Sequence, residues 1–183
     1  MASVFGHALA AIALGTAFNK KIVNRKFWTL GTICSIVPDA DVITFKYGIP
    51  YESFWGHRGF THSFLFALII GVLFTALFYR LQLKKLSSYL LIFYFTLCTA
   101  SHSILDAMTN GGLGVAFFSP WDNSRYFFQW RPIKVSPIGI DNFLSEWGIQ
   151  VIMNEIVWIG IPCGLFILST GIIKKLAHNN SRS

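Results

Sequence analysis

Five long apolar stretches constrain this chain more than any other feature of its sequence. Short polar connections separate them, apart from one long loop at residues 109–146. The stretches cover residues 4–18, 27–45, 60–79, 88–108 and 147–173. A helix needs about 20 apolar residues to cross the hydrocarbon core of a bilayer, and the last three stretches meet that length. We therefore predict an all-α, polytopic membrane protein with about five transmembrane helices, which form a single integral membrane domain over residues 1–183.

The composition agrees with a bilayer as the solvent. Hydrophobic residues make up 54% of the chain and charged residues only 13%, which is about half the share of a typical soluble domain. So few charges cannot cover a surface that faces water on all sides. The alternative is a soluble, all-α lipid-binding or phospholipase-like fold, and membrane association that resists alkali would reject it. None of the three cysteines has a CxxC partner, so neither a disulfide framework nor a thiolate zinc site is predicted.

The basic residues gather on one side of the predicted spans. Residues 19–26, 80–87 and 174–183 together hold ten Lys and Arg and no acidic residue. By the positive-inside rule these segments face the cytoplasm. We therefore predict a multi-pass protein of the cytoplasmic (inner) membrane whose N-terminus and loop 109–146 lie outside and whose C-terminus lies in the cytoplasm. Because the net charge of +7 comes from residues that flank spans, nucleic-acid binding is not predicted.

Most histidines and half of the acids fall on the outer side of this topology, and they come from five different helices. The candidate metal ligands are His7, Asp39, Asp41, His57, His62, His102 and Asp106, and Glu155 lies at the same level. Imidazole and carboxylate are ligands for zinc and similar divalent ions, and an isolated carboxylate inside a membrane is costly. The pattern therefore predicts a divalent metal site on the extracytoplasmic face, with zinc as the expected metal and one or two ions.

Spacing supports part of this set. His102 and Asp106 form H-x-x-x-D, which puts both side chains on one face of a helix. Asp39 and Asp41, in P-D-A-D, can both face the site only if the helix ends near Pro38. The candidates outnumber the four ligands of a tetrahedral site. They fit two metals, or one metal with a second layer of supporting side chains, and the sequence leaves both readings open.

Three motifs resemble those of a known family. They are P-D-A-D, G-H-R-G-F-T-H-S and S-H-S-I-L-D-A-M-T-N-G-G, and they look like the bacterial inner-membrane family of predicted metal-dependent hydrolases whose founder is linked to the LexA regulon. The likeness runs from residue 6 to residue 158. It implies a site composed of His7, Asp39, Asp41, His57, Arg58, Thr61, His62, His102, Asp106 and Glu155. A more distant likeness, in ligand order only, is to zinc-dependent phospholipase C.

The resulting hypothesis is a membrane-bound metal-dependent hydrolase that acts on an anionic lipid or phosphoester at the outer face of the cytoplasmic membrane. Bound metal would activate a water, Asp41, Asp39 or Glu155 would serve as the base, and Arg58 would pair with a phosphate oxygen. The rival hypothesis is a non-enzymatic metal-binding or transport protein, since intramembrane acids and histidines also line ion paths. The sequence leaves the bond cleaved and the oligomeric state open.

Overall fold

The regular structure of this computed structural model is helical. It describes residues 1–80, 85–137 and 139–180, and within them no strand occurs. The elements are α1 (Val4–Gly15), α2 (Arg25–Ile36), η1 (Val37–Tyr47), η2 (Phe60–His62), α3 (Phe64–Tyr79), α4 (Leu86–Ala107), α5 (Ile140–Phe143), α6 (Glu146–Glu155), η3 (Ile156–Gly160) and α7 (Ile161–Asn180). Segments η1 and η2 are 3-10 helices, and η3 is a π-helical turn. The all-α prediction is confirmed for the described residues.

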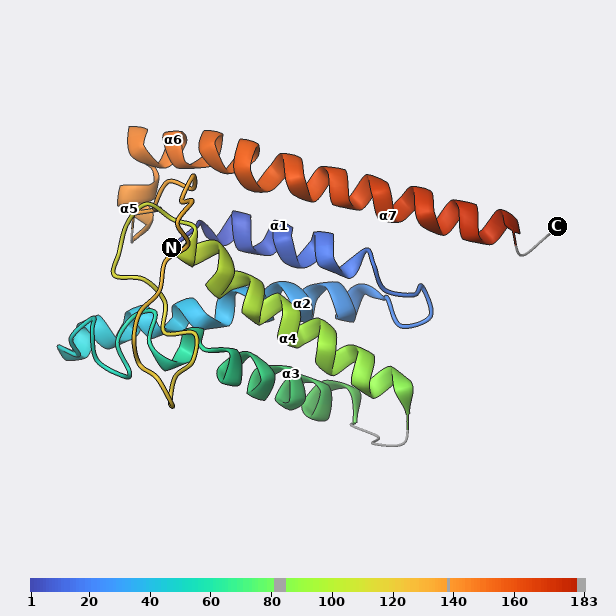
Figure 1. Cartoon of the computed structure of the whole chain (residues 1–183), viewed down its shortest axis with the longest axis horizontal. Coiled ribbons are helices and arrows are strands. Elements are labelled where there is room, and N and C mark those ends of the chain that lie inside the picture. The colour runs from blue at the N-terminus through green and yellow to red at the C-terminus, as the bar shows by residue number, and fades with distance from the viewer. Residues whose placement is uncertain (81–84, 138, 181–183) are drawn as a thin grey trace.

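Helices α1 to α4 pack side by side, and α6 to α7 run along α1 (Figure 1). The core between them is aromatic, with the Phe27 and Tyr94 rings stacked at 3.8 Å between centroids. Gly31 permits this close packing, because a Cβ on Gly31 would lie 2.1 Å from the Tyr94 hydroxyl oxygen. The N-terminus, η1 and the 109–146 loop share one end of the bundle, and α7 ends beyond the other.

The expected end of an α-helix near Pro38 is confirmed, because α2 ends at Ile36 and the chain continues as the 3-10 helix η1, in which Pro38 lacks the N–H that an α-helix needs. Two other predicted boundaries are wrong. The first helix ends at Gly15 instead of residue 18. The fifth stretch is helical from Glu146 to Asn180, further than predicted. Of the described helices, this one and α4 are long and apolar enough to cross a membrane, and α1 and α3 are shorter apolar helices. Five spans are therefore not established by helix length.

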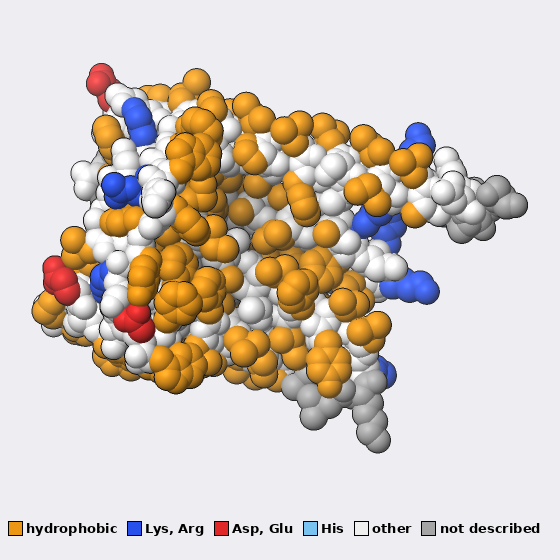
Figure 2. Space-filling view, viewed as in Figure 1, with side chains coloured by type: hydrophobic (Ala, Val, Ile, Leu, Met, Phe, Trp, Pro, Cys, Tyr) orange, Lys and Arg blue, Asp and Glu red, His pale blue; other side chains and the backbone are white. Residues whose placement is uncertain are grey.

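Apolar and charged side chains occupy different parts of the surface along the bundle axis. Apolar side chains cover most of the face shown in Figure 2, and charged side chains lie at its two ends. The end away from the 109–146 loop shows Lys and Arg alone, whereas the loop end shows both signs of charge. Lys84 and Arg182, which belong to the predicted basic set, lie outside the described residues. None of the residues of α7 is fully buried, and most of its large apolar side chains are exposed.

The long loop folds back on the end of the bundle. Isolated bridges pair Thr109 with Ile133 and Val115 with Tyr126. The loop also bonds to the segment before α3, where the Ala116 N–H donates to the carbonyl of Arg58 at 3.0 Å. Its second half includes α5. The loop therefore covers the end of the bundle where the sequence places the candidate ligands.

Candidate metal centre

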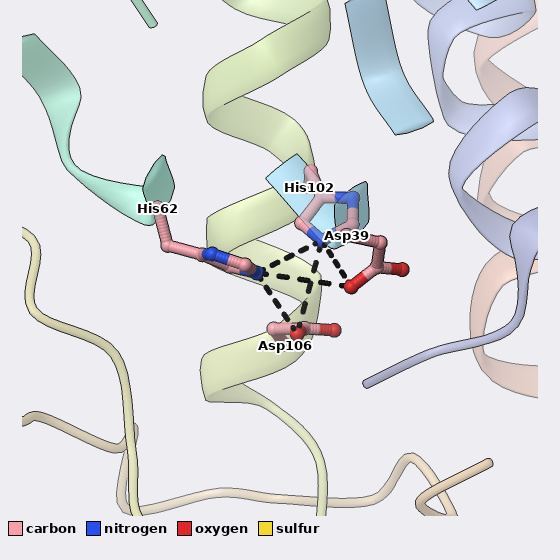
Figure 3. Close-up of side chains that lie close together, drawn as sticks. All are labelled: Asp39, His62, His102 and Asp106. Atoms are coloured by element: carbon pink, nitrogen blue, oxygen red, sulfur yellow. Dashed lines mark hydrogen bonds and ion pairs between the residues drawn. The ribbon is translucent and has the colours of Figure 1, made fainter. Parts of the chain in front are cut away.

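Four buried side chains bring one ligand atom each to a common point (Figure 3). Asp39 comes from η1, His62 from η2, and His102 and Asp106 from α4. Their ligand atoms all lie within 4.8 Å of one another. The 3-10 geometry of η1 turns Asp39 inward, and the i, i+4 spacing on α4 stacks His102 and Asp106 on one face, as the sequence predicts.

The separations match those of a tetrahedral site. His62 Nε2 lies 3.1 Å from His102 Nε2, 3.6 Å from Asp106 Oδ2 and 3.9 Å from Asp39 Oδ1. His102 Nε2 lies 3.3 Å from Asp39 Oδ1 and 3.9 Å from Asp106 Oδ2. Atoms bound to zinc at about 2.0–2.2 Å with tetrahedral angles lie about 3.3–3.6 Å apart. The four atoms therefore need only small shifts to share one ion.

A second layer of hydrogen bonds sets the two imidazoles. His102 donates its Nδ1–H to the carbonyl oxygen of Ser35 at 2.7 Å, and the Nδ1 of His62 lies 3.2 Å from Asp41 Oδ2. The Ser35 carbonyl can only accept, so the His102 ring carries a proton on Nδ1. The Nδ1 of His62 also lies 3.1 Å from the Thr61 hydroxyl, and with its proton on Nδ1 this ring would present its Nε2 to a metal as well. This is the arrangement in which metal-binding histidines are usually held.

Asp41 serves this second layer. Its Oδ1 lies 2.6 Å from His57 Nδ1, and its Oδ2 accepts from the Thr61 hydroxyl at 2.6 Å and from the Arg58 N–H at 3.1 Å. Asp41, His57 and His62 form a second group that could hold a metal ion, but it shares His62 with the first group. Burial lowers the pKa of His57, and the hydrogen bond with Asp41 opposes that shift only in part. His57 is therefore neutral and donates to Asp41.

The guanidinium of Arg58 is buried and bonds to other groups of the protein. Its side chain has no exposed surface, and its Nε donates to Asp106 Oδ2 at 3.0 Å. Its Nη1 donates to the carbonyl of Gly111 at 2.9 Å and its Nη2 to the hydroxyl of Thr109 at 3.0 Å. All three nitrogens thus have protein acceptors. In this conformation Arg58 orients a candidate ligand and offers no surface to a phosphate, contrary to the expected anion-binding role.

Two further predicted residues lie beside the four-residue group. His7 stacks on His102 with 3.7 Å between ring centroids, and its Nε2 lies 3.4 Å from Asp106 Oδ1. Glu155, at the end of α6, accepts from both the N–H and the hydroxyl of Ser3. Neither residue joins a group of converging ligand atoms. Glu155 instead ties the segment before α1 to the start of η3.

The residues present fit a divalent cation. When both imidazoles carry their proton on Nδ1 alone, as metal binding requires, all four converging atoms offer a lone pair to a cation. Asp39 is 7% exposed, and neither of its carboxylate oxygens has a hydrogen-bond partner within the described structure. A buried carboxylate without a donor is costly, and a cation at the centre of the four atoms removes that cost. Two nitrogens and two oxygens suit zinc and similar divalent metals.

Comparison with known proteins now identifies the family. A family model described as YdjM inner membrane protein matches residues 1–177. The chain belongs to this family. It is also similar to Inner membrane protein YbcI of Escherichia coli (strain K12), with 35% identity over 162 residues that cover 88% of this chain and 92% of YbcI. No solved structure is significantly similar. Neither name states an activity, so YdjM-family membership establishes an inner membrane protein and leaves its reaction open.

Sequence reasoning missed three residues that support the site of this YdjM-family chain. Thr109 accepts from Arg58, and it was present in the quoted motif that ends T-N-G-G. Ser3 bonds to Glu155, and its nearness to His7 was the available signal. Ser35 acts through its backbone carbonyl. No residue type is needed for such a contact, so the sequence carries no signal for it.

Two basic residues of the outer loop make contacts within the protein. Arg125 donates to the carbonyls of His57 at 2.8 Å and Tyr51 at 2.7 Å. The Arg131 guanidinium lies over the Phe127 ring. These two cations therefore help to fold the loop.

Proposed function

We propose that this YdjM-family protein is a membrane-bound metal-dependent hydrolase that acts on an anionic lipid or phosphoester at the outer face of the cytoplasmic membrane. One observation carries the proposal: four buried ligand atoms from three separate segments converge within 4.8 Å, with five of their six separations between 3.1 and 3.9 Å. We assign Asp39, His62, His102 and Asp106 as ligands, with zinc as the expected ion. When bound, such an ion supplies Lewis acidity and a water that ionises near neutral pH.

The other residues have supporting roles in this proposal. Asp41 orients His62 and Arg58 orients Asp106, so both are positioning residues. Asp41 is a poor candidate for the base, because hydrogen-bond donors surround both of its oxygens. Glu155 is engaged by Ser3. Asp39 Oδ2 is not one of the four converging ligand atoms, and no donor bonds to it. We therefore propose that this oxygen accepts the proton of the attacking water.

The proposed orientation has five spans, with the N-terminus outside and the C-terminus in the cytoplasm. The charge distribution supports it, because the end of the bundle away from the site carries only Lys and Arg on the face shown in Figure 2. The site then lies on the extracytoplasmic side of the membrane. A lipid substrate in the outer leaflet can then reach the site without crossing the bilayer.

Metal analysis of detergent-purified protein tests the ligand set. We expect the wild type to retain one divalent ion per chain, and Asp39→Ala, His102→Ala and Asp106→Ala to lose most of it. His178→Ala, near the end of α7 and away from the site, is the control and should retain the wild-type amount. Equal metal content in all five proteins would refute the site.

Hydrolysis is tested separately, with metal-loaded protein and phosphoester lipids. We expect release of the headgroup by the wild type and by His178→Ala, and no release by His102→Ala. A protein that retains its metal and leaves every lipid intact would instead support the non-enzymatic metal-binding or transport alternative.

A further inference from the structure

An open apolar groove on the outside of the bundle leads to the candidate metal centre. It has a volume of about 440 Å³, and the start of α1, the end of α2 and η1 form its walls. Val4, Ile33, Ile36 and Val42 are among the side chains that line it, together with Asp39. Among the described residues, Asp39 is the one charged side chain in this lining. The groove is therefore an apolar channel with a candidate metal ligand in its wall.

The groove continues in both directions. A second groove of about 480 Å³ shares Val4 and Val42 with it and extends toward α5. A third, of about 420 Å³, shares Ile33 and extends between α1 and α2 as far as Ile12 and Trp28. Together the three grooves form one track. It follows α1 from Val4 to Ile12 for about 12 Å, at about 1.5 Å per residue. Helices α1 and α2 lie side by side along this length (Figure 1).

The lining of this track faces the membrane. Val4 is 44% exposed and Ile33 is 43% exposed, so both are open to the surroundings of the protein. In a protein of an inner membrane family, those surroundings are lipid chains. An extended peptide would leave its backbone N–H and C=O groups without partners in so apolar a lining, whereas a hydrocarbon chain has none to satisfy.

Asp39 distinguishes this track from ordinary lipid-facing surface. Its carboxylate is more than nine-tenths buried, it has no hydrogen-bond donor, and it lies at the junction of the groove with the ligand group. A molecule that fills the track therefore needs an apolar tail and a polar head at the position of Asp39. Each groove volume falls within the range of about 300–1,000 Å³ that is typical of small-molecule sites.

We propose that this track binds one acyl chain of a membrane lipid and thereby holds the headgroup of that lipid at the metal centre. Binding of the acyl chain is inferred from the groove alone, whereas the fate of the headgroup rests on the proposed function. The lipid enters sideways from the outer leaflet, between the start of α1 and η1. The track then acts as the specificity-determining part of the site, because molecules without a long chain lack the contacts that hold the headgroup in place.

Photo-crosslinking tests the acyl chain directly. The probe is phosphatidylglycerol with a diazirine in one acyl chain, in nanodiscs that contain the purified full-length protein. We expect adducts, mapped by mass spectrometry, to concentrate on α1 and α2 beside the track. Val4→Trp and Ile33→Trp fill the groove and should lose most of these adducts. The control Leu165→Trp adds the same bulk on α7, where Leu165 is 62% exposed, and should retain them.

Metal content is measured in the same samples, so that the two proposals fail separately. Track adducts that disappear in both groove variants while their metal content stays at the wild-type value support the acyl-chain site, even if no lipid is hydrolysed. Adducts spread evenly over the apolar surface, or unchanged in Val4→Trp and Ile33→Trp, overturn it. Either of these results leaves the metal-dependent hydrolase proposal standing if headgroup release is still observed.

Discussion

At the scale of single residues, the candidate site depends on which nitrogen of each imidazole carries the proton. The carbonyl of Ser35 accepts the Nδ1–H of His102, and the Nδ1 of His62 lies 3.2 Å from Asp41 Oδ2, so rings protonated at Nδ1 alone would leave both Nε2 atoms for a metal. Thr61 and His57 also bond to the Asp41 carboxylate and hold it in place beside His62. Supporting contacts of this kind typically contribute about 10–100-fold to metal affinity.

Thr61 provides a test of that layer. Thr61→Val keeps the shape and removes the hydroxyl that donates to Asp41 Oδ2, so we expect metal affinity to fall by about 10–100-fold. Thr61→Ser keeps the hydroxyl and should remain close to the wild type. Competition with a fluorescent chelator measures the affinities.

Thr75→Val is the matched control, because the Thr75 hydroxyl donates to the carbonyl of Gly71 inside α3. It should leave metal affinity unchanged. An equal affinity of Thr61→Val and the wild type would show that Asp41 does not act through this hydrogen bond.

At the scale of elements, the close approach of α2 to α4 places the ligands of α4 opposite η1. This approach depends on Gly31, whose position leaves no room for a side chain beside Tyr94. Ser35 lies about one turn beyond Gly31 on α2, the candidate ligand His102 lies about two turns beyond Tyr94 on α4, and the two residues share a hydrogen bond. A change in the spacing of α2 and α4 would therefore shift residues of the candidate metal centre.

We expect Gly31→Ala to destabilise the protein by about 1–3 kcal/mol, because its Cβ would overlap the Tyr94 ring. Thermal unfolding in detergent, followed by tryptophan fluorescence, measures the effect. Gly164→Ala on α7 is the control, since a Cβ there meets nothing within 4 Å, and alanine favours a helix by up to about 1 kcal/mol over glycine. Equal stability of Gly31→Ala and the wild type would contradict the close packing of α2 on α4.

At the scale of the whole molecule, the site lies at one end of an apolar bundle, and the opposite end shows only Lys and Arg among its charged side chains. The positive-inside rule then predicts the side of the membrane on which the site works. We expect a reporter fused after Ser183 to be cytoplasmic and one inserted after Asp122, in the outer loop, to be periplasmic. The reverse pattern would place the site on the cytoplasmic face and would remove an outer-leaflet lipid as its substrate.

The sequence predicted the site best where one helix contains both partners. His102 and Asp106 share a helix face whatever the fold, so their spacing was sufficient. Asp39 joins the buried group because the α-helix ends before Pro38. The burial and the acceptors of Arg58 depend on how the long loop returns, so its sequence neighbours did not indicate them. Glu155 was predicted as a possible base, and its pairing with Ser3 likewise depends on how α6 lies against α1.

The origin of the four ligands in separate segments has a consequence for biogenesis. His102 follows Asp39 by 63 residues in the chain, and both belong to the same group of ligand atoms. During synthesis, Asp39 leaves the ribosome well before α4 is made. If this group holds an ion as proposed, the nascent chain cannot complete the ligand set until the fourth helix has packed against η1, and metal loading would then be a late event that reports completed assembly of the bundle.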